Sequence, residues 1–143
     1  MTLSLFRDAL TYPRLSEAWI KVRANRGAPG VDGVTLVAFE RNLEDRLRQI
    51  QHDVLQGGYR PAPLLAVEMH REGKGPRHLA IPTVRDRVIQ TAVALVLTPI
   101  FEAEFEDASF AYRRGRSVKR AIERVLRYRD LGYRWVVDAD ISA

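Results

Sequence analysis

The sequence predicts an α+β fold that is rich in helices, with one β-hairpin and one strand near the carboxyl end. Apolar residues recur at helical spacing in several separate stretches. Two apolar runs flank a glycine-containing charged turn, a pattern typical of a hairpin, and an alternating run follows the last helical stretch. With 143 residues and 46% hydrophobic composition, the chain is long enough to bury one globular core.

Two helices are predicted around a turn-rich loop. The first runs from Pro13 to about Asn25, and the second from about Leu36 to Gln56 with one continuous apolar stripe. The loop between them, residues 27–33, holds three glycines and one proline and therefore predicts tight turns. Two interpretations of this loop stay open: a linker between helices, or a rigid loop that lies close to a nucleic-acid backbone.

The predicted hairpin has strands at residues 64–70 and 76–81 and a basic tip. Arg71, Lys74 and Arg77 gather at or beside this tip. A solvated charged turn explains them, and so does a clamp for a triphosphate or for a nucleic-acid backbone.

A sharp corner is predicted where the hairpin ends. Pro82 favours extended backbone at the preceding residue, and Thr83 with Asp86 three residues later resembles a capping box for a new helix. That helix is predicted to run to about Thr98, where Pro99 should break or kink it.

The first turn of this helix carries two cations that oppose the helix dipole. Arg85 and Arg87 lie there, so we expect an anionic partner or the neighbouring Asp86 to offset them. The acidic residues between positions 102 and 107 predict a solvated connector.

The stretch 109–117 interleaves two aromatic residues with three arginines, an arrangement suited to base stacking and phosphate contact. Ser117 is predicted to cap a helix that ends near Asp130. Its apolar face is expected to be buried and comprises Val118, Ala121, Ile122 and Val125. Its basic face comprises Lys119, Arg120, Arg124 and Arg127. Nucleic-acid binding and plain solubility both explain the basic face.

Residues 134–141 predict the last strand, with Asp138 and Asp140 on one of its faces. Two carboxylates on one face indicate a divalent metal site. Oxygen ligands from elsewhere would have to complete it.

The composition limits the class of protein. The net charge is +5, and the excess of cations lies in residues 113–143. Twenty of the 23 basic residues are arginine, which favours a nucleic-acid partner, although a GC-rich genome gives the same excess. The absence of cysteine excludes disulfides and thiolate metal sites and fits a cytoplasmic location. No apolar run is long enough for a membrane span, and the first ten residues make a poor signal peptide.

Four blocks of this sequence occur in an order that resembles the amino-terminal half of bacterial reverse transcriptases of the group II intron lineage. The blocks are residues 27–34, 77–90, 109–117 and 135–141. The resemblance begins near Leu15 and covers most of the chain. Within the third block, the run from Ala111 to Arg114 most resembles the branch associated with CRISPR spacer acquisition.

The resemblance implies roles for particular residues. Asp140 matches the first metal-binding aspartate of the polymerase palm, with the Ile141 carbonyl as a further ligand. Arg77 matches the arginine of the fingers that lies against the incoming triphosphate, and Arg71 and Lys74 compete for a neighbouring cationic position. Arg113 and Arg116 match positions near the template or the nucleotide.

The resemblance and the basic patterns described above together give the residues expected to contact nucleic acid: Arg85, Arg87, Arg113, Arg114, Arg116, Lys119 and Arg120.

The implied fold is the fingers and the start of the palm of a right-hand polymerase. Residues 1–133 would form an amino-terminal extension and the fingers, and residues 134–143 the first palm strand. The implied activity is RNA-directed DNA synthesis with two Mg²⁺ ions about 4 Å apart. The implied partners are an RNA template, a DNA primer, deoxynucleoside triphosphates and a fused or associated CRISPR integrase.

The sequence departs from the family: no Asp-Asp pair occurs in it, and the aromatic run that follows the first palm aspartate in the family is absent as well. The family carries its remaining palm carboxylates in a Tyr-x-Asp-Asp hairpin. We therefore expect an amino-terminal fragment that does not polymerise by itself. Two alternatives stay open, a group II intron maturase and a non-catalytic RNA-binding module.

Overall fold

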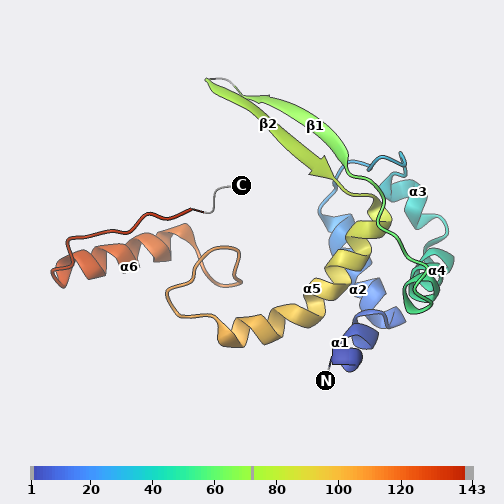
Figure 1. Ribbon diagram of the computed structural model, residues 1–143, viewed down its shortest axis with the longest axis horizontal. Coiled ribbons are helices and arrows are strands. Elements are labelled where there is room, and N and C mark those ends of the chain that lie inside the picture. The colour runs from blue at the N-terminus through green and yellow to red at the C-terminus, as the bar shows by residue number, and fades with distance from the viewer. Residues whose placement is uncertain (1, 72, 141–143) are drawn as a thin grey trace. The chain divides into compact units, whose positions relative to one another are not determined.

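The computed structural model describes residues 2–71 and 73–140 (Figure 1). The chain divides into two compact units, Met1–Ile100 and Phe101–Ala143. The elements in chain order are α1 (Thr2–Ala9), α2 (Tyr12–Ala24), α3 (Leu36–Glu40), α4 (Leu43–Leu55), β1 (Leu65–Arg71), β2 (Lys74–Ile81), α5 (Val84–Glu104) and α6 (Val118–Asp130). The mixed, helix-rich composition agrees with the predicted α+β class.

The core of the first unit forms where the apolar stripes of α2, α4 and α5 meet. Its centre includes Leu15 from α2, Leu47 from α4 and Val88 from α5, all fully buried. Trp19 stacks on Phe39 with 5.1 Å between the ring centroids. The periodicity of the apolar residues therefore located this core correctly.

The helix predicted from Leu36 to Gln56 is wrong, because the structure contains two helices there. Thr35 caps α3 by accepting a hydrogen bond from the Ala38 N–H at 3.1 Å. At Asn42 the backbone leaves helical geometry, with φ −127° and ψ 46°, and α4 begins at the next residue. Both helices turn apolar side chains towards the same core, so their combined pattern reads as one stripe. The helix α1 was not predicted.

The β-hairpin is confirmed (Figure 1). Its strands pair antiparallel, with Val67 opposite Leu79 and Met69 opposite Arg77. The second strand begins at Lys74, so the connection is shorter than predicted. Because strand side chains alternate between faces, Arg77 shares a face with Leu79 and with the residues opposite them.

The predicted end of this helix at about Thr98 is wrong, because α5 continues through Pro99 to Glu104. Proline removes a single N–H donor from a helix, and helical bonding resumes beyond it. The N–H of Phe105 donates to the carbonyl of Phe101 at 3.0 Å. Glu102 and Glu104 are consequently helical rather than part of an irregular connector.

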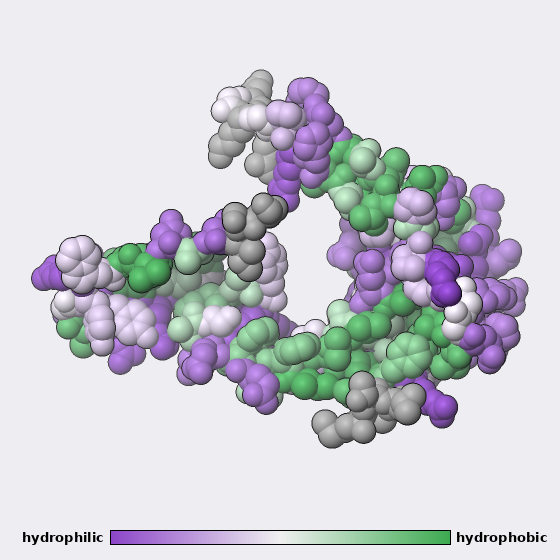
Figure 2. All heavy atoms as spheres, viewed as in Figure 1, coloured by the Kyte–Doolittle hydropathy of each residue, from purple (hydrophilic) through white to green (hydrophobic). Residues whose placement is uncertain are grey.

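In the second unit the predicted cap of α6 is confirmed, because Ser117 accepts a hydrogen bond from the Arg120 N–H at 3.3 Å. The predicted burial of its apolar face is wrong. Val118 is 78% exposed and Val125 is 61% exposed. Apolar side chains of this unit reach the surface in the space-filling view (Figure 2). Amphipathic spacing identifies the apolar face of a helix but does not guarantee that another element covers it.

The predicted strand at residues 134–141 is also wrong over its described part. Residues 134–140 are irregular, and Trp135 is 95% exposed. Within the described residues the sheet contains β1 and β2 alone, so no strand supplies backbone partners to this segment.

Candidate nucleic-acid interface

The corner between β2 and α5 is built around one buried carboxylate. Thr83 accepts a hydrogen bond from the Asp86 N–H at 3.1 Å and donates its hydroxyl proton to Asp86 Oδ2 at 2.7 Å. Asp86 also accepts hydrogen bonds from the Tyr59 hydroxyl at 2.6 Å and from the Ala62 N–H at 3.2 Å. Thr83 and Asp86 are each 3% exposed. The capping interaction is confirmed, and its carboxylate additionally ties the segment after α4 to the corner.

The partly buried position of Tyr59 changes its acidity. Burial, and then the hydrogen bond to Asp86, raise the pKa of Tyr59 to about 12. The neutral phenol therefore stays a hydrogen-bond donor to Asp86 throughout the physiological pH range.

The loop at residues 27–33 packs directly on this corner. A Cβ atom at Gly30 would lie 2.7 Å from the backbone N and Cα atoms of Thr83, so only glycine allows this approach. Arg87 donates a hydrogen bond to the carbonyl oxygen of Ala28 at 2.7 Å, and burial lowers the pKa of Arg87. The loop connects α2 to α3 and contacts Thr83 and the Arg87 side chain of α5. Its contact with a nucleic-acid backbone stays a prediction.

Arg85 finds its anionic partner inside the protein. Its guanidinium lies 2.6 Å from Asp53 Oδ2 on α4 and over the ring of Tyr59, 5.4 Å from the centroid. Asp53, rather than Asp86, is thus the carboxylate that offsets Arg85 in the first turn of α5. Arg85 and Asp53 are 32 residues apart, and no signal in the sequence connects them.

The backbone places the three hairpin cations at one end of the ribbon. Arg71 pairs with Lys74 across the turn, and Arg77 follows on β2 opposite Met69. The Arg77 side chain is exposed, and among the described residues no ion pair engages it. The strand register therefore confirms that the backbone positions of these residues lie close together. Their binding role stays a prediction.

Arg113 organises the irregular segment that precedes α6. Its side chain is 7% exposed and donates to Glu102 Oε1 through two nitrogen atoms, at 2.8 and 2.9 Å. It also donates to the carbonyl oxygens of Glu106 at 2.8 Å and of Ser109 at 3.0 Å. The hydrogen bond from Arg113 lowers the pKa of Glu102. These partners indicate that Arg113 shapes the segment.

The other basic residues of this segment differ in their surroundings. Arg116 pairs with Asp107 at 3.1 Å and lies over the ring of Phe110. Arg114 is exposed, and in the described part of the chain no ion pair engages it. Lys119 lies 4.0 Å from Glu123. Among the arginines expected to contact nucleic acid, Arg85, Arg113 and Arg116 pair with carboxylates. Arg87 instead donates to a backbone carbonyl oxygen.

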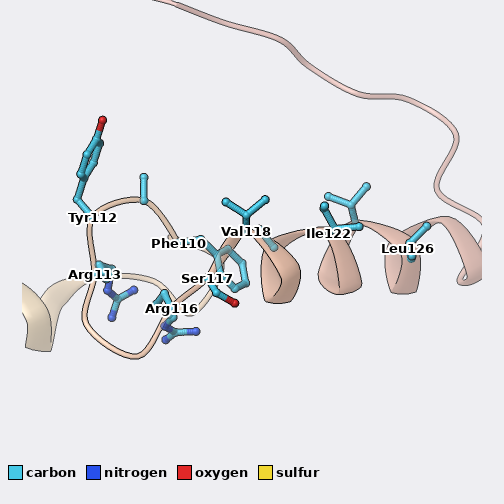
Figure 3. A pocket seen from close by; sticks show the side chains of 11 residues that line it. Phe110, Tyr112, Arg113, Arg116, Ser117, Val118, Ile122 and Leu126 are labelled. Carbon is cyan, nitrogen blue, oxygen red and sulfur yellow. The ribbon is translucent and has the colours of Figure 1, made fainter.

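A surface pocket of about 580 Å³ lies beside this segment (Figure 3). Tyr112, Val118 and Ile122 point to one side of the chain, whereas Arg113 and Arg116 point to the other (Figure 3). Tyr112 has a positive φ of 58° and is fully exposed. An exposed ring of this kind suits stacking on a base.

The metal-binding role of Asp140 and Ile141 stays a prediction. Asp138 and Asp140 are exposed on the irregular segment, and Ile141 lies outside the described residues. Carboxylate oxygens suit Mg²⁺. However, no group of three potential His, Cys, Asp or Glu ligands occurs among residues 2–71 and 73–140. Arg77 belongs to the first unit and Asp140 to the second.

No protein-family model matches the chain. The proteins similar to it include group II intron-encoded proteins and nuclear intron maturases. The chain is 36% identical over 141 residues to Protein YkfC of Escherichia coli K12, covering 94% of the chain and 37% of that protein. It is 32% identical over 126 residues to the group II intron-encoded protein LtrA of Lactococcus lactis, covering 87% of the chain and 21% of LtrA. Nuclear intron maturase 2 of Arabidopsis thaliana is 40% identical over 58 residues, 41% of the chain and 8% of that protein.

The chain thus spans about a third of YkfC and about a fifth of LtrA. These homologues agree with the resemblance to the group II intron lineage and leave the CRISPR branch without support. Among the described helices, none has the combination of length and apolar character that crossing a membrane requires.

Proposed function

We propose that the chain is the fingers and the start of the palm of an RNA-directed DNA polymerase of the group II intron lineage. The observation that carries this proposal is the similarity to LtrA, a group II intron-encoded protein, over 87% of the chain. In this proposal residues 1–133 form the amino-terminal extension and fingers, and residues 134–143 begin the palm. A longer polypeptide of the kind represented by YkfC and LtrA supplies the rest of the enzyme.

The hairpin is the proposed contact for the incoming deoxynucleoside triphosphate. Arg77 is exposed, and the register brings it near Arg71 and Lys74 at the end of the ribbon. Cations fixed in position stabilise the charge that develops on a reacting phosphate. The Thr83–Asp86 corner supports this role because it anchors the base of the hairpin through buried hydrogen bonds.

Other residues act on nucleic acid either directly or by positioning. Arg114 is available for the RNA template or the DNA primer, and the exposed ring of Tyr112 is available for a base. Arg85, Arg87 and Arg113 hold the surrounding segments in shape through internal partners. Asp140 is the proposed palm carboxylate. In a complete enzyme Mg²⁺ would be the cofactor, held with carboxylates from beyond the described residues.

The biological task that the comparisons favour is work on intron RNA. LtrA is named as a group II intron-encoded protein, and the two Arabidopsis relatives are named as nuclear intron maturases. We therefore place maturase activity, the assistance of RNA splicing, ahead of spacer acquisition with a CRISPR integrase. A role in antiviral defence belongs to the spacer-acquisition alternative and stays a prediction. The cytoplasmic location that the absence of cysteine suggests also stays a prediction.

The test is primer extension on an RNA template with the complete product of the reading frame that encodes this chain. We expect Asp140→Asn to lower DNA synthesis by about 100-fold or more and to leave primer-template affinity unchanged. The resemblance gives the metal role to Asp140 and not to Asp138. Asp138→Asn is therefore the matched control, because it removes the same charge two residues away and should retain synthesis. Equal synthesis by both variants and the unaltered protein would refute the polymerase assignment of Asp140.

The triphosphate role of Arg77 has a separate test. Arg77→Ala should raise the KM for deoxynucleoside triphosphates more than it weakens primer-template binding. Equal losses in both would remove this role. A product that binds RNA and supports splicing, but makes no DNA in any form, would favour the non-catalytic module.

A further inference from the structure

The four arginines of α6, with Arg113 and Arg116 from the segment before it, divide into two sets according to their carboxylate partners. Arg113, Arg116 and Arg129 each form an ion pair, with Glu102, Asp107 and Asp130 respectively. Arg120, Arg124 and Arg127 form none within the described part of the chain. The positive charge of these last three guanidinium groups is therefore not neutralised locally.

The three unneutralised arginines share one side of α6. They occupy positions i, i+4 and i+7, which fall within about 60° of one another around the helix axis and extend about 10 Å along it. Together with Phe110 and Arg116 they line a surface groove of about 240 Å³. A line of cations along a groove is the arrangement that follows a chain of phosphates.

Neutral groups hold two of these guanidinium groups in place. Arg120 donates to the carbonyl oxygen of Gly115 at 2.9 Å. Arg124 donates to the Tyr128 hydroxyl at 3.3 Å and lies over the Tyr128 ring, 5.5 Å from its centroid. Such contacts orient a side chain without cancelling its charge, so the remaining N–H donors are available for an anion.

The groove contains one carboxylate, and that carboxylate has its own cation. Glu123 lines the groove and lies 4.0 Å from Lys119. Because Arg116 is paired with Asp107, the net positive charge of the groove comes from Arg120, Arg124 and Arg127.

We propose that this groove, lined by Arg120, Arg124 and Arg127, binds the phosphodiester backbone of a nucleic-acid strand. Guanidinium groups bind phosphate bidentately, and backbone contact carries no base sequence, so RNA and DNA should bind alike. The inference rests on the proposed function for the identity of the strand, a template or a primer. It goes beyond that function in assigning the binding to one groove and in adding Arg124 and Arg127 to Arg120 as contacts.

The test is fluorescence anisotropy of labelled single-stranded RNA and DNA 20-mers of one sequence, titrated with the 143-residue chain. The test variant combines Arg120→Gln, Arg124→Gln and Arg127→Gln. Each lost phosphate contact should reduce the salt slope by about 0.7, which corresponds to about fivefold in affinity at 0.1 M salt. The triple variant should therefore bind about 100-fold more weakly, with a slope smaller by about 2.

Arg129→Gln is the matched control on the same helix. Arg129 lies nine residues after Arg120, on the opposite side of α6, and it is already paired with Asp130. The Arg129→Gln variant should bind RNA and DNA nearly as tightly as the unaltered chain. Circular dichroism should show the same helical content for both variants. Equal weakening of both at equal helicity would overturn the proposal.

Vesicles that contain an anionic phospholipid test the alternative that the groove binds a lipid surface instead of nucleic acid. Binding of vesicles that depends on the three arginines, together with RNA and DNA binding that does not, would overturn the proposal in favour of a lipid surface. Because these titrations need no DNA synthesis, their outcome is separable from the primer-extension test. Binding that depends on the groove, in a protein that makes no DNA, would refute the proposed function and leave the groove proposal standing.

Discussion

The buried carboxylate of Asp86 offers the sharpest test of how the corner is held together. Replacing Asp86 with alanine removes the acceptor for hydrogen bonds from Tyr59, Ala62 and Thr83. The Thr83 hydroxyl is buried, whereas Tyr59 and Ala62 are only partly buried and can regain water. The substitution therefore leaves one fully buried donor and two partly buried donors without their partner.

These losses set the expected size of the effect. A hydrogen bond to a charged group contributes about 1.5–3 kcal/mol, and a stranded buried donor costs about 1–3 kcal/mol. With the two partly buried donors discounted for access to water, we expect Asp86→Ala to lower the free energy of unfolding of the first unit by about 4 kcal/mol. For a unit of this size, that loss lowers Tm by about 15–30 °C.

Urea unfolding followed by tryptophan fluorescence measures this change in the first unit. Of the two tryptophans, Trp19 is 3% exposed in the core and Trp135 is 95% exposed in the second unit. The change in signal on unfolding should therefore come from Trp19. Asp45→Ala, an exposed acidic residue in the first turn of α4, is the control and should cost at most about 1 kcal/mol. A loss below about 1 kcal/mol for Asp86→Ala would refute the reasoning.

Three further predictions concern the loop, the second unit and pH. Gly30→Ala should destabilise the first unit by about 1–3 kcal/mol in the same urea assay, because its Cβ meets the backbone of Thr83 at 2.7 Å. Gly75→Ala, where a Cβ meets nothing within 4 Å, should change little. Arg113→Lys should speed proteolysis of residues 105–117, because an ammonium group cannot reproduce the planar fork of bonds; unchanged cleavage would contradict the organising role. Burial raises the pKa of Tyr59 to about 12, so its contribution to stability is complete below pH 10 and disappears by about pH 12. The stability difference between the unaltered chain and Tyr59→Phe should shrink over that interval, and a constant difference would argue against the raised pKa.

The residues that define local structure were readable from the sequence. Thr83 and Ser117 cap helices where their spacing predicts, and the hairpin turn lies between the predicted strands. These features depend on contacts between neighbours in the chain, which the order of residues records directly.

Features that depend on a distant partner were not readable. The apolar pattern of α6 is the same whether or not another element covers it, so the expected burial of Val118 and Val125 was wrong. The alternation in residues 134–140 likewise indicates a possible strand but not the neighbour that a strand requires. A helix break such as that at Asn42 is hidden when the helices on both sides face one core.

The division of the arginines was the least predictable part of the candidate site. Arg85 meets Asp53 from another helix, and Arg113 meets Glu102 across an irregular segment. Composition counts all these arginines equally. Only the folded structure shows which of these arginines form ion pairs with carboxylates.

The unequal distribution of ion pairs around α6 gives the two sides of this helix different net charges. The field of the unpaired side extends into solvent, whereas that of Arg129 is cancelled at its source by Asp130. This field would orient an approaching polyanion before it contacts the surface. At 0.1 M salt, screening limits this alignment to distances of about 10 Å from the helix.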